Sequence, residues 1–445
     1  MDYLLYLSLG LIIIYVEIKR QRYFLIDHLT LFNAFFFLVY VFTPISLMFL
    51  SDDILSHDLA LGKYYLGKNP YTAFIIFSAY LFFLSGYYWR APRDKVSNVS
   101  FEFRVAHETI MTWMPMVYLV LVAMMTVYVG AEGGLQQTIN NAELYRGGVI
   151  FAKYGFLTRL FPLNQILLYY FFYKLFLEKN SNFVGSYIIY FIISLALFFV
   201  IVALNNSRGF LILSLLGMYI MTAMYHKRYF IKFLVVAAIF GFIVIKYGDP
   251  FFHAIPSFVD YGWDTFVSTF ADRIAQIDAS KGSIVANFAH PLLSLEVSLS
   301  LTGGEVDFRY FVDFLQAFIA ILPNSLLGIE DPQFVMILNT ELLYGEKVSI
   351  VLPGILALFA YSLNVVGVYL GMFIYGMYGG VLSEIFKNLY IKYPSSLVFI
   401  YLLSMTYGYF VFRGSPRNAL MNLFVLLVVL IFFFFLSRLH YEKKM

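Results

Sequence analysis

The sequence predicts an all-α, polytopic membrane protein, and three observations carry this prediction. Hydrophobic residues make up 61% of the 445-residue chain and charged residues only 13%, whereas soluble globular proteins carry about 25% charged residues. The apolar runs are about as long as the roughly 20 residues that a helix needs to cross a bilayer. They are also continuous rather than alternating in polarity, which excludes an outer-membrane β-barrel.

We expect about eleven transmembrane helices, within a range of ten to twelve, from the number of long apolar runs. The runs cover residues 3–18, 29–50, 71–89, 111–130, 160–177, 184–204, 210–225, 229–247, 363–386, 394–412 and 418–437. The first and the seventh are short for a hydrocarbon core of about 30 Å. A further apolar segment at residues 351–361 is shorter, contains Pro353-Gly354 and precedes Asn364. We interpret it as a hairpin or re-entrant segment.

Lysine and arginine set the expected orientation, because short basic loops stay in the cytoplasm. Basic clusters lie at residues 19–22, 90–104, 174–179, 227–232, 387–392 and 438–444. If these clusters are cytoplasmic, the N-terminus lies outside the membrane and the C-terminus inside.

This topology divides the chain into three segments. Residues 1–247 are expected to form an N-terminal membrane bundle of about eight spans, residues 248–349 a large extracytoplasmic loop, and residues 350–445 a C-terminal bundle of about three spans. Within the loop, the apolar stretch 311–327 predicts a helix that lies in the membrane interface. Long loops are usually functional, so we expect the function of the protein to lie on the outer side.

Composition excludes several kinds of function. The chain has no cysteine, so disulfides, thiolate catalysis and cysteine metal sites are impossible. The large loop has no HExxH, DxD or paired carboxylates at metal-ligand spacing, and we expect neither a metal nor another cofactor. A net charge of +3 is small for this length and argues against a nucleic-acid partner.

Arginines in short outer loops are the most unusual feature of the sequence. Arg208 lies in Asn205-Asn206-Ser207-Arg208-Gly209, and Arg413 and Arg417 lie in Arg413-Gly414-Ser415-Pro416-Arg417, each time between two spans. Short outer loops normally avoid positive charge, because it opposes membrane insertion in that orientation. A guanidinium presents a donor fork that fits a phosphate. These loops therefore predict that the outer face binds an anion, such as a lipid-linked pyrophosphate.

The outer side is expected to hold further arginines. We predict that Arg273 and Arg309 also bind the pyrophosphate or its glycan, together with Arg208, Arg413 and Arg417. For Arg146, Arg159 and Arg309 the competing interpretation is structural: an interfacial anchor, or an ion pair with a nearby acid. Asp307 and Asp313 lie close to Arg309 in the sequence, and Asp272 precedes Arg273.

The large loop also offers candidates for a general base. A neutral histidine can take a proton from a sugar hydroxyl at neutral pH, which favours His290 and, less strongly, His253. Glu296 and Asp307 are the candidate carboxylate bases. The alternatives are a structural hydrogen-bonding histidine and solvated loop acids. Most of the many aromatic residues are expected to anchor and pack the spans, although rings also stack on sugars.

A series of short motifs runs from about residue 180 to residue 437. In chain order they are Asn205-Asn206-Ser207-Arg208-Gly209; Asp307-Phe308-Arg309 before an apolar run ending Ile321-Leu322-Pro323-Asn324; Leu352-Pro353-Gly354 before a span with Asn364, Gly367, Gly371, Gly376 and Gly379-Gly380; and Arg413-Gly414-Ser415-Pro416-Arg417. This order, with a large outer loop, resembles the O-antigen polymerase (Wzy) superfamily, which includes the enterobacterial common antigen polymerase.

The resemblance implies a glycosyltransferase of the C class in the bacterial inner membrane, with its active site facing the periplasm. Such an enzyme transfers a growing glycan from undecaprenyl pyrophosphate onto a new undecaprenyl-pyrophosphate-linked oligosaccharide repeat unit. The product is O-antigen or a similar surface polysaccharide. The implied partners are this lipid-linked oligosaccharide, membrane lipid and a polysaccharide chain-length regulator.

Two alternatives remain open at the level of sequence. An O-antigen ligase, which moves the finished glycan to another acceptor, would share the arginines and the outer loop. A flippase or exporter of lipid-linked oligosaccharide would not be an enzyme. It would be expected to have charged residues in the middle of its spans and internal repeats, and the sequence shows neither.

Overall fold

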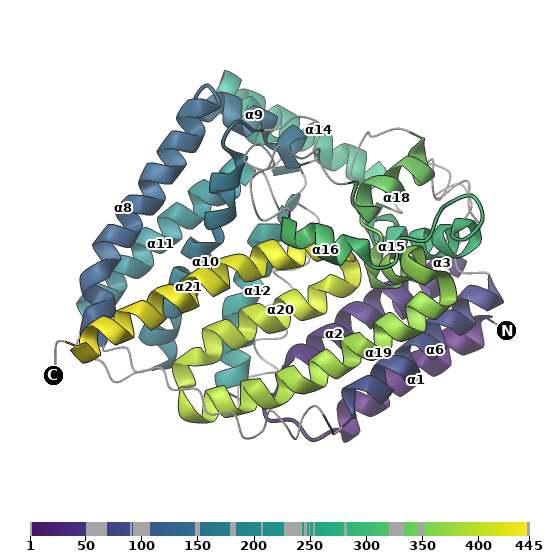
Figure 1. Cartoon of the computed structure of the whole chain (residues 1–445). Coiled ribbons are helices and arrows are strands. Elements are labelled where there is room, and N and C mark those ends of the chain that lie inside the picture. The colour runs from purple at the N-terminus through teal and green to yellow at the C-terminus, as the bar shows by residue number, and fades with distance from the viewer. Residues whose placement is uncertain are drawn as a thin grey trace. The chain divides into compact units, whose positions relative to one another are not determined.

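The computed structural model describes most of the chain and is built from helices (Figure 1). It covers residues 2–49, 69–89, 91, 107–146, 152–178, 184–205, 208–226, 243, 247–248, 250–251, 254–279, 283–319, 333–345 and 351–442. Within these residues the extended structure consists of one isolated bridge between Thr302 and Val306.

The helices have the following bounds in chain order. They are α1 (Asp2–Lys19), α2 (His28–Phe37), η1 (Leu38–Phe42), α3 (Thr43–Phe49), α6 (Pro70–Tyr87), α8 (His107–Ala131), α9 (Leu135–Arg146), η2 (Gly155–Leu160), α10 (Pro162–Phe172), η3 (Tyr173–Leu177), α11 (Val184–Asn205), α12 (Arg208–Tyr225), α14 (Trp263–Ala279), α15 (Ser283–Leu301), α16 (Val312–Ile319), α18 (Val335–Tyr344), α19 (Gly354–Lys392), η5 (Pro394–Ser396), α20 (Leu397–Arg413) and α21 (Pro416–Glu442).

Seven helical segments in the described part of the chain are long and apolar enough to cross a membrane. They are His28–Phe49, Pro70–Tyr87, Met111–Ala131, Gly155–Leu177, Val184–Asn205, Gly354–Lys392 and Pro394–Arg413. The prediction of an all-α, polytopic membrane protein is therefore confirmed. The total of eleven stays a prediction. Most of the expected run 229–247 lies outside the described residues, α1 at the expected first span is not among the seven, and the apolar parts of α12 and α21 are shorter.

The chain folds as two compact units. The first comprises residues 1–99, 277–393 and 403–420, and the second comprises residues 100–276, 394–402 and 421–445. The three segments expected from the sequence follow membrane crossings, whereas the compact units follow packing, so the two divisions need not coincide.

Within the first unit, α6 and α19 approach each other closely through glycines. A Cβ atom at Gly86 would lie 2.0 Å from the carbonyl oxygen of Phe373, and one at Gly376 would lie 2.0 Å from that of Phe83. Small residues allow such backbone contact between membrane helices, where dispersion replaces the hydrophobic effect as the main attraction. Part of the glycine series in the expected span 363–386 therefore serves helix packing.

Helix α19 is broken at Leu363 and Asn364, whose backbone angles are not helical (φ −152°, ψ 33° and φ 51°, ψ −138°). The carbonyls of Tyr361 and Ser362, freed by the break, accept hydrogen bonds from the backbone N–H groups of Arg309 (3.0 Å) and Tyr310 (3.1 Å). Non-helical backbone is tolerated at membrane depth where the protein itself satisfies its polar groups.

The side chain of Asn364 fixes the position of this break. Its Nδ2 donates to the carbonyls of Leu299 (3.3 Å) and Thr302 (2.8 Å) at the end of α15, and its Oδ1 accepts from the N–H of Val365 at 2.8 Å. The segment 351–361 is therefore not a hairpin. Its helical part is the short, buried beginning of α19, which continues after the break into the predicted span.

The expected outer loop 248–349 is largely helical where it is described. It contributes α14, α15, α16 and α18, and α15 packs against α19 in the first unit. Leu292, Leu293 and Leu295 of α15 are completely buried. Of the interfacial helix predicted at 311–327, the structure describes α16, and residues 320–327 lie outside the described part.

The second unit contains α8, α10, α11 and α12, which pack through buried hydrophobic clusters and are also connected by hydrogen bonds. Asn164 donates to the carbonyl of Ser194 at 2.9 Å, and the hydroxyl of Tyr169 donates to the carbonyl of Ser214 at 3.0 Å. Hydrogen bonds of this kind connect helices in a setting where water does not compete.

Candidate functional site

Two of the predicted arginines and the 413–417 loop meet at the start of α18. Arg309 donates from Nη2 to the carbonyl of Gln333 at 2.6 Å. The guanidinium of Arg417 lies 5.2 Å from the ring centroid of Phe334, and the hydroxyl of Ser415 lies 3.8 Å from the sulfur of Met336. Arg309 and Arg417 thus meet neighbouring residues of this helix start, and Arg413 begins the loop that carries Arg417. All three belong to the first unit, and we call them the arginine cluster.

Arg413 is held by an aromatic ring. It is the last residue of α20, where the helix dipole favours a cation, and its guanidinium carbon lies 4.9 Å from the ring centroid of Tyr409. Its Nε is buried without a hydrogen-bond partner, and no carboxylate among the described residues pairs with it. A ring face stabilises the positive charge but takes up none of the guanidinium donors in the ring plane.

A close backbone contact positions the 413–417 loop. Gly414 has a φ of 55°, and a Cβ atom there would lie 2.1 Å from the carbonyl oxygen of Gly354. Gly354, the first residue of α19, has a φ of 73° and would place a Cβ atom 2.6 Å from Pro291. Both positions therefore require glycine, for conformation and for space.

Arg309, in contrast, is engaged in a local ion pair. Its Nε and Nη2 donate to the two carboxylate oxygens of Asp313 at 2.7 and 3.1 Å, and the side chains are only 13% and 1% exposed. Asp313 also accepts from the backbone N–H of Val335 at 2.7 Å and so caps the start of α18. The competing interpretation of Arg309 as the partner of a nearby acid is therefore what the structure shows.

His290 lies on the part of α15 that borders the 413–417 loop. The next residue, Pro291, packs against Gly354, and the ring of Phe288 lies 5.6 Å from that of Phe412. The imidazole of His290 is half-buried, 6.4 Å from the ring of Tyr344. Of the predicted bases, His290 thus lies close in the fold to Arg413.

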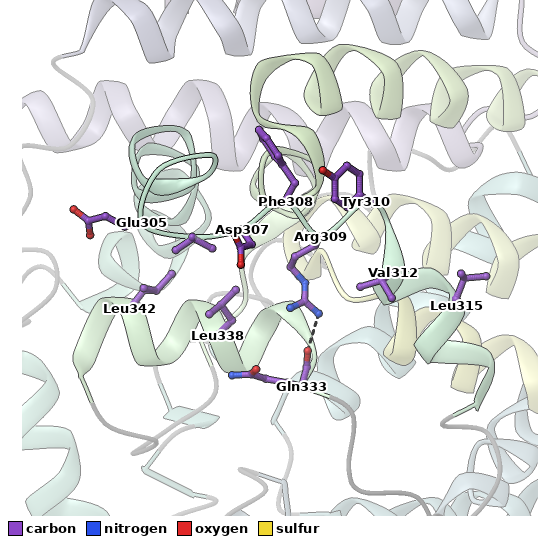
Figure 2. Close-up of a pocket in the computed structure, with 11 residues that line it drawn as sticks. Glu305, Asp307, Phe308, Arg309, Tyr310, Val312, Leu315, Gln333, Leu338 and Leu342 are labelled. Atoms are coloured by element: carbon purple, nitrogen blue, oxygen red, sulfur yellow. Dashed lines mark hydrogen bonds between the residues drawn. The ribbon is translucent and has the colours of Figure 1, made fainter.

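Asp307 lies in a pocket of about 860 Å³ beside Arg309 (Figure 2). The pocket is lined by the segment 305–310 and by residues from α16 and α18. Figure 2 shows Asp307 and Arg309 projecting towards Leu338 and Gln333, whereas the rings of Phe308 and Tyr310 project to the other side of the segment.

The remaining predicted residues lie elsewhere. Glu296 follows His290 by six residues, about 9 Å along the helix axis, and interacts electrostatically with Tyr6 of α1. Arg208 is the first residue of α12 and Arg273 lies half-buried in α14, both in the second unit. The side chain of Arg208 and all of His253 lie outside the described residues.

Sequence reasoning did not single out several residues of this region. Tyr409, Gln333 and Phe334 contact the arginine cluster but belong to no recognisable motif, because their role depends on a turn of α20 and on the position of α18. In the sequence, Asp313 is recognisable only as a close neighbour of Arg309. Its double contact, to Arg309 and to the start of α18, could not be predicted from spacing.

In the described residues, no group of three or more histidine and acidic side chains is placed to hold a metal ion. Comparisons of the chain with protein-family models, with curated proteins and with solved structures found no match.

Proposed function

We propose that the protein is a membrane glycosyltransferase that polymerises polyprenyl-pyrophosphate-linked oligosaccharide repeat units on the periplasmic side of the bacterial inner membrane. The observation that carries the proposal is the environment of Arg413. Its guanidinium lies on the ring of Tyr409 and pairs with no described carboxylate. Two residues further along the chain, Ser415 contacts Met336 in the first turn of α18. The motif order that resembles the O-antigen polymerases supports the same function.

The charge of the arginine cluster favours an anionic leaving group. Arg309 is neutralised by Asp313, whereas Arg413 pairs with no carboxylate among the described residues and brings its charge to the site. Each donor that meets the developing diphosphate charge can contribute about 2–4 kcal/mol to the transition state. Arg208 belongs to the second unit, and its role as a ligand of the pyrophosphate stays a prediction from the sequence.

The proposed reaction is a glycosyl transfer with a balanced exchange of bonds. The acceptor hydroxyl oxygen attacks the anomeric carbon of the donor glycan, and the bond from that carbon to the diphosphate oxygen breaks. The hydroxyl proton passes to a base, for which His290 and Asp307 are the candidates nearest the arginine cluster. Polyprenyl pyrophosphate leaves with the bonding electrons.

Purified protein in liposomes tests this function directly. When it is supplied with the polyprenyl-pyrophosphate-linked repeat unit of its own cells, we expect longer glycans on the carrier and release of polyprenyl pyrophosphate. If neither longer glycans nor free polyprenyl pyrophosphate were formed, the proposal would be wrong.

Deletion of the gene separates the three functions considered. Loss of a polymerase leaves single repeat units attached to the lipid core, and loss of a ligase leaves polymer on the carrier. Loss of a flippase leaves no surface glycan.

Labelling can test the orientation, because the chain has no cysteine and a single one can be introduced without background. Glu305 is exposed beside the candidate site. We expect a Glu305→Cys variant to react with a membrane-impermeant maleimide from the periplasmic side. Reaction from the cytoplasmic side alone would refute the proposed topology.

A further inference from the structure

The pocket beside Arg309 has a different chemistry from the arginine cluster that borders it. Among the described residues that line it, Glu305 and Asp307 bring two carboxylates, and the one cation, Arg309, is paired with Asp313. These residues give the wall a net negative charge. A diphosphate would be repelled here, so this pocket needs another kind of ligand.

Its lining combines hydrogen-bonding and apolar groups. Asp307 and the side-chain amide of Gln333 line the pocket together with Leu338, Leu342 and Val312 (Figure 2). Carboxylates accept hydrogen bonds from hydroxyl groups, and an amide both donates and accepts. The apolar side chains suit the C–H faces of a sugar ring, and a volume of about 860 Å³ lies within the usual range of ligand pockets.

The pocket is built on a rigid support. Tyr310 and Phe311 have positive φ angles of 46° and 59°, which non-glycine residues rarely adopt. The hydrogen bonds from Arg309 and Tyr310 to the carbonyls of Tyr361 and Ser362 hold this segment on the broken helix α19. Strained backbone that is held in this way is typical of functional sites.

The pocket and the arginine cluster share residues. Arg309 and Gln333 line the pocket and also form the contact at the start of α18. The next residue, Phe334, contacts Arg417. A ligand in the pocket would thus lie next to a diphosphate at the cluster.

We infer that this pocket binds the acceptor glycan, with Asp307 accepting a hydrogen bond from a sugar hydroxyl and Leu338 and Leu342 contacting the ring. This inference rests on the proposed function, since it names the place of one of the two substrates. It separates the recognition of the sugar, at an acidic pocket, from that of the diphosphate, at Arg413 and Arg417.

Two probes test the inference on the full chain in detergent. The first is the repeat-unit oligosaccharide, released from its carrier by mild acid, and the second is inorganic pyrophosphate. We expect Asp307→Ala, which removes an exposed carboxylate, and Leu338→Trp, which fills the pocket, to weaken oligosaccharide binding at least about tenfold. Pyrophosphate binding should stay within about twofold of wild type, which also shows that the variants are folded.

Asp264→Ala is the matched control, because Asp264 is an exposed acid of α14 that does not line the pocket. If Leu338→Trp does not fold, Leu342→Trp replaces it. Unchanged oligosaccharide binding in Asp307→Ala and the filled variant would overturn the inference and leave the proposed function intact. The inference would also be overturned, with the proposed function intact, if the pocket bound polyprenyl phosphate without sugar instead of the oligosaccharide. A wild-type protein that binds neither probe and makes no polymer would refute both.

Discussion

Arg20 and Arg413 are both arginines of the first compact unit whose Nε is buried without a hydrogen-bond partner, yet their surroundings differ. Arg20 follows α1 and donates to the two carboxylate oxygens of Asp27 at 2.6 and 2.7 Å, and to Glu17 at 3.1 Å. Arg413 lies on the ring of Tyr409 and pairs with no carboxylate among the described residues.

The difference separates a structural arginine from one that is available to a ligand. A guanidinium whose donors meet carboxylates gains nothing further from a phosphate, because the phosphate would have to displace them. A guanidinium on a ring face keeps its in-plane donors for another acceptor. Arg309, with its pair to Asp313, belongs with Arg20 in this respect.

The largest expected effect is the loss of stability in Arg20→Ala. Breaking a buried pair leaves an uncompensated charge, here on Asp27, whose side chain is 9% exposed. We expect the free energy of unfolding to fall by about 3–5 kcal/mol, measured by denaturant or thermal unfolding in detergent. The activity of the protein that remains folded should be near that of wild type.

A double variant checks this interpretation. Arg20→Met combined with Asp27→Leu removes both charges, and replacement of a buried pair by apolar residues is often neutral or stabilising. We therefore expect much of the lost stability to return. A double variant as unstable as Arg20→Ala would show that Arg20 acts through contacts other than this ion pair.

Arg413→Ala should show the opposite behaviour. Loss of one donor to the developing diphosphate lowers the rate of polymerisation by roughly 10²–10³-fold, or about 2.7–4 kcal/mol, while the unfolding transition moves little. Rate and unfolding are to be measured on the same preparation.

Two variants sharpen this test of Arg413. Arg413→Lys keeps the charge without the planar fork, so most of the activity should still be lost if contact to phosphate is bidentate. Lys387→Ala, at an exposed position of α19, removes one positive charge elsewhere and should be nearly as active as wild type. Polymerisation at the wild-type rate in Arg413→Ala would remove this residue from the site.

A smaller effect is expected for Gly414→Ala, which disturbs the loop without removing a charge. The new Cβ would lie 2.1 Å from the carbonyl of Gly354, at a φ of 55° that alanine disfavours. We expect a loss of about 1–3 kcal/mol in stability together with reduced activity, since Arg413 would shift. An active, fully stable variant would show that the two backbones can separate freely.

The sequence was sufficient to predict the class of fold, because long apolar runs have few other solutions in a membrane. It was also sufficient to single out the 413–417 loop, because short loops on the outer side, where this loop is expected, rarely carry positive charge. It was insufficient for the break in α19, because the hydrogen bonds of Asn364 to Leu299 and Thr302 depend on the end of a helix that lies 65 and 62 residues earlier in the chain.

Spacing also failed to separate the roles of the individual arginines. Arg309 and Arg413 are equivalent as residue types, and only their partners distinguish them. Asp313 follows Arg309 by four residues on the adjoining α16, whereas Tyr409 precedes Arg413 by four within α20. The identity of the residue one turn away therefore decides whether each guanidinium is neutralised, and helical structure had to be known before that rule could be applied.

The smallest expected effect is on the pH dependence of stability, and it again contrasts Arg20 with Arg413. Burial by itself raises the pKa of Asp27, but the hydrogen bonds and the charge of Arg20 outweigh it and lower that pKa below its usual value. A lowered pKa in the folded state stabilises the protein above the pKa of the unfolded state, about 3.9. This stability is lost as the pH falls through the folded pKa. We therefore expect no contribution of the Arg20–Asp27 pair to pH dependence between pH 5 and 8, and a decline in stability below about pH 4.

The decline should be smaller in the Arg20→Met/Asp27→Leu variant. Arg413, which has no described carboxylate to protonate, should contribute nothing to it, so an Arg413→Ala variant should follow the wild-type acid unfolding curve. A displaced curve in that variant would show that Arg413 is paired with an acid after all, and the contrast with Arg20 would no longer hold.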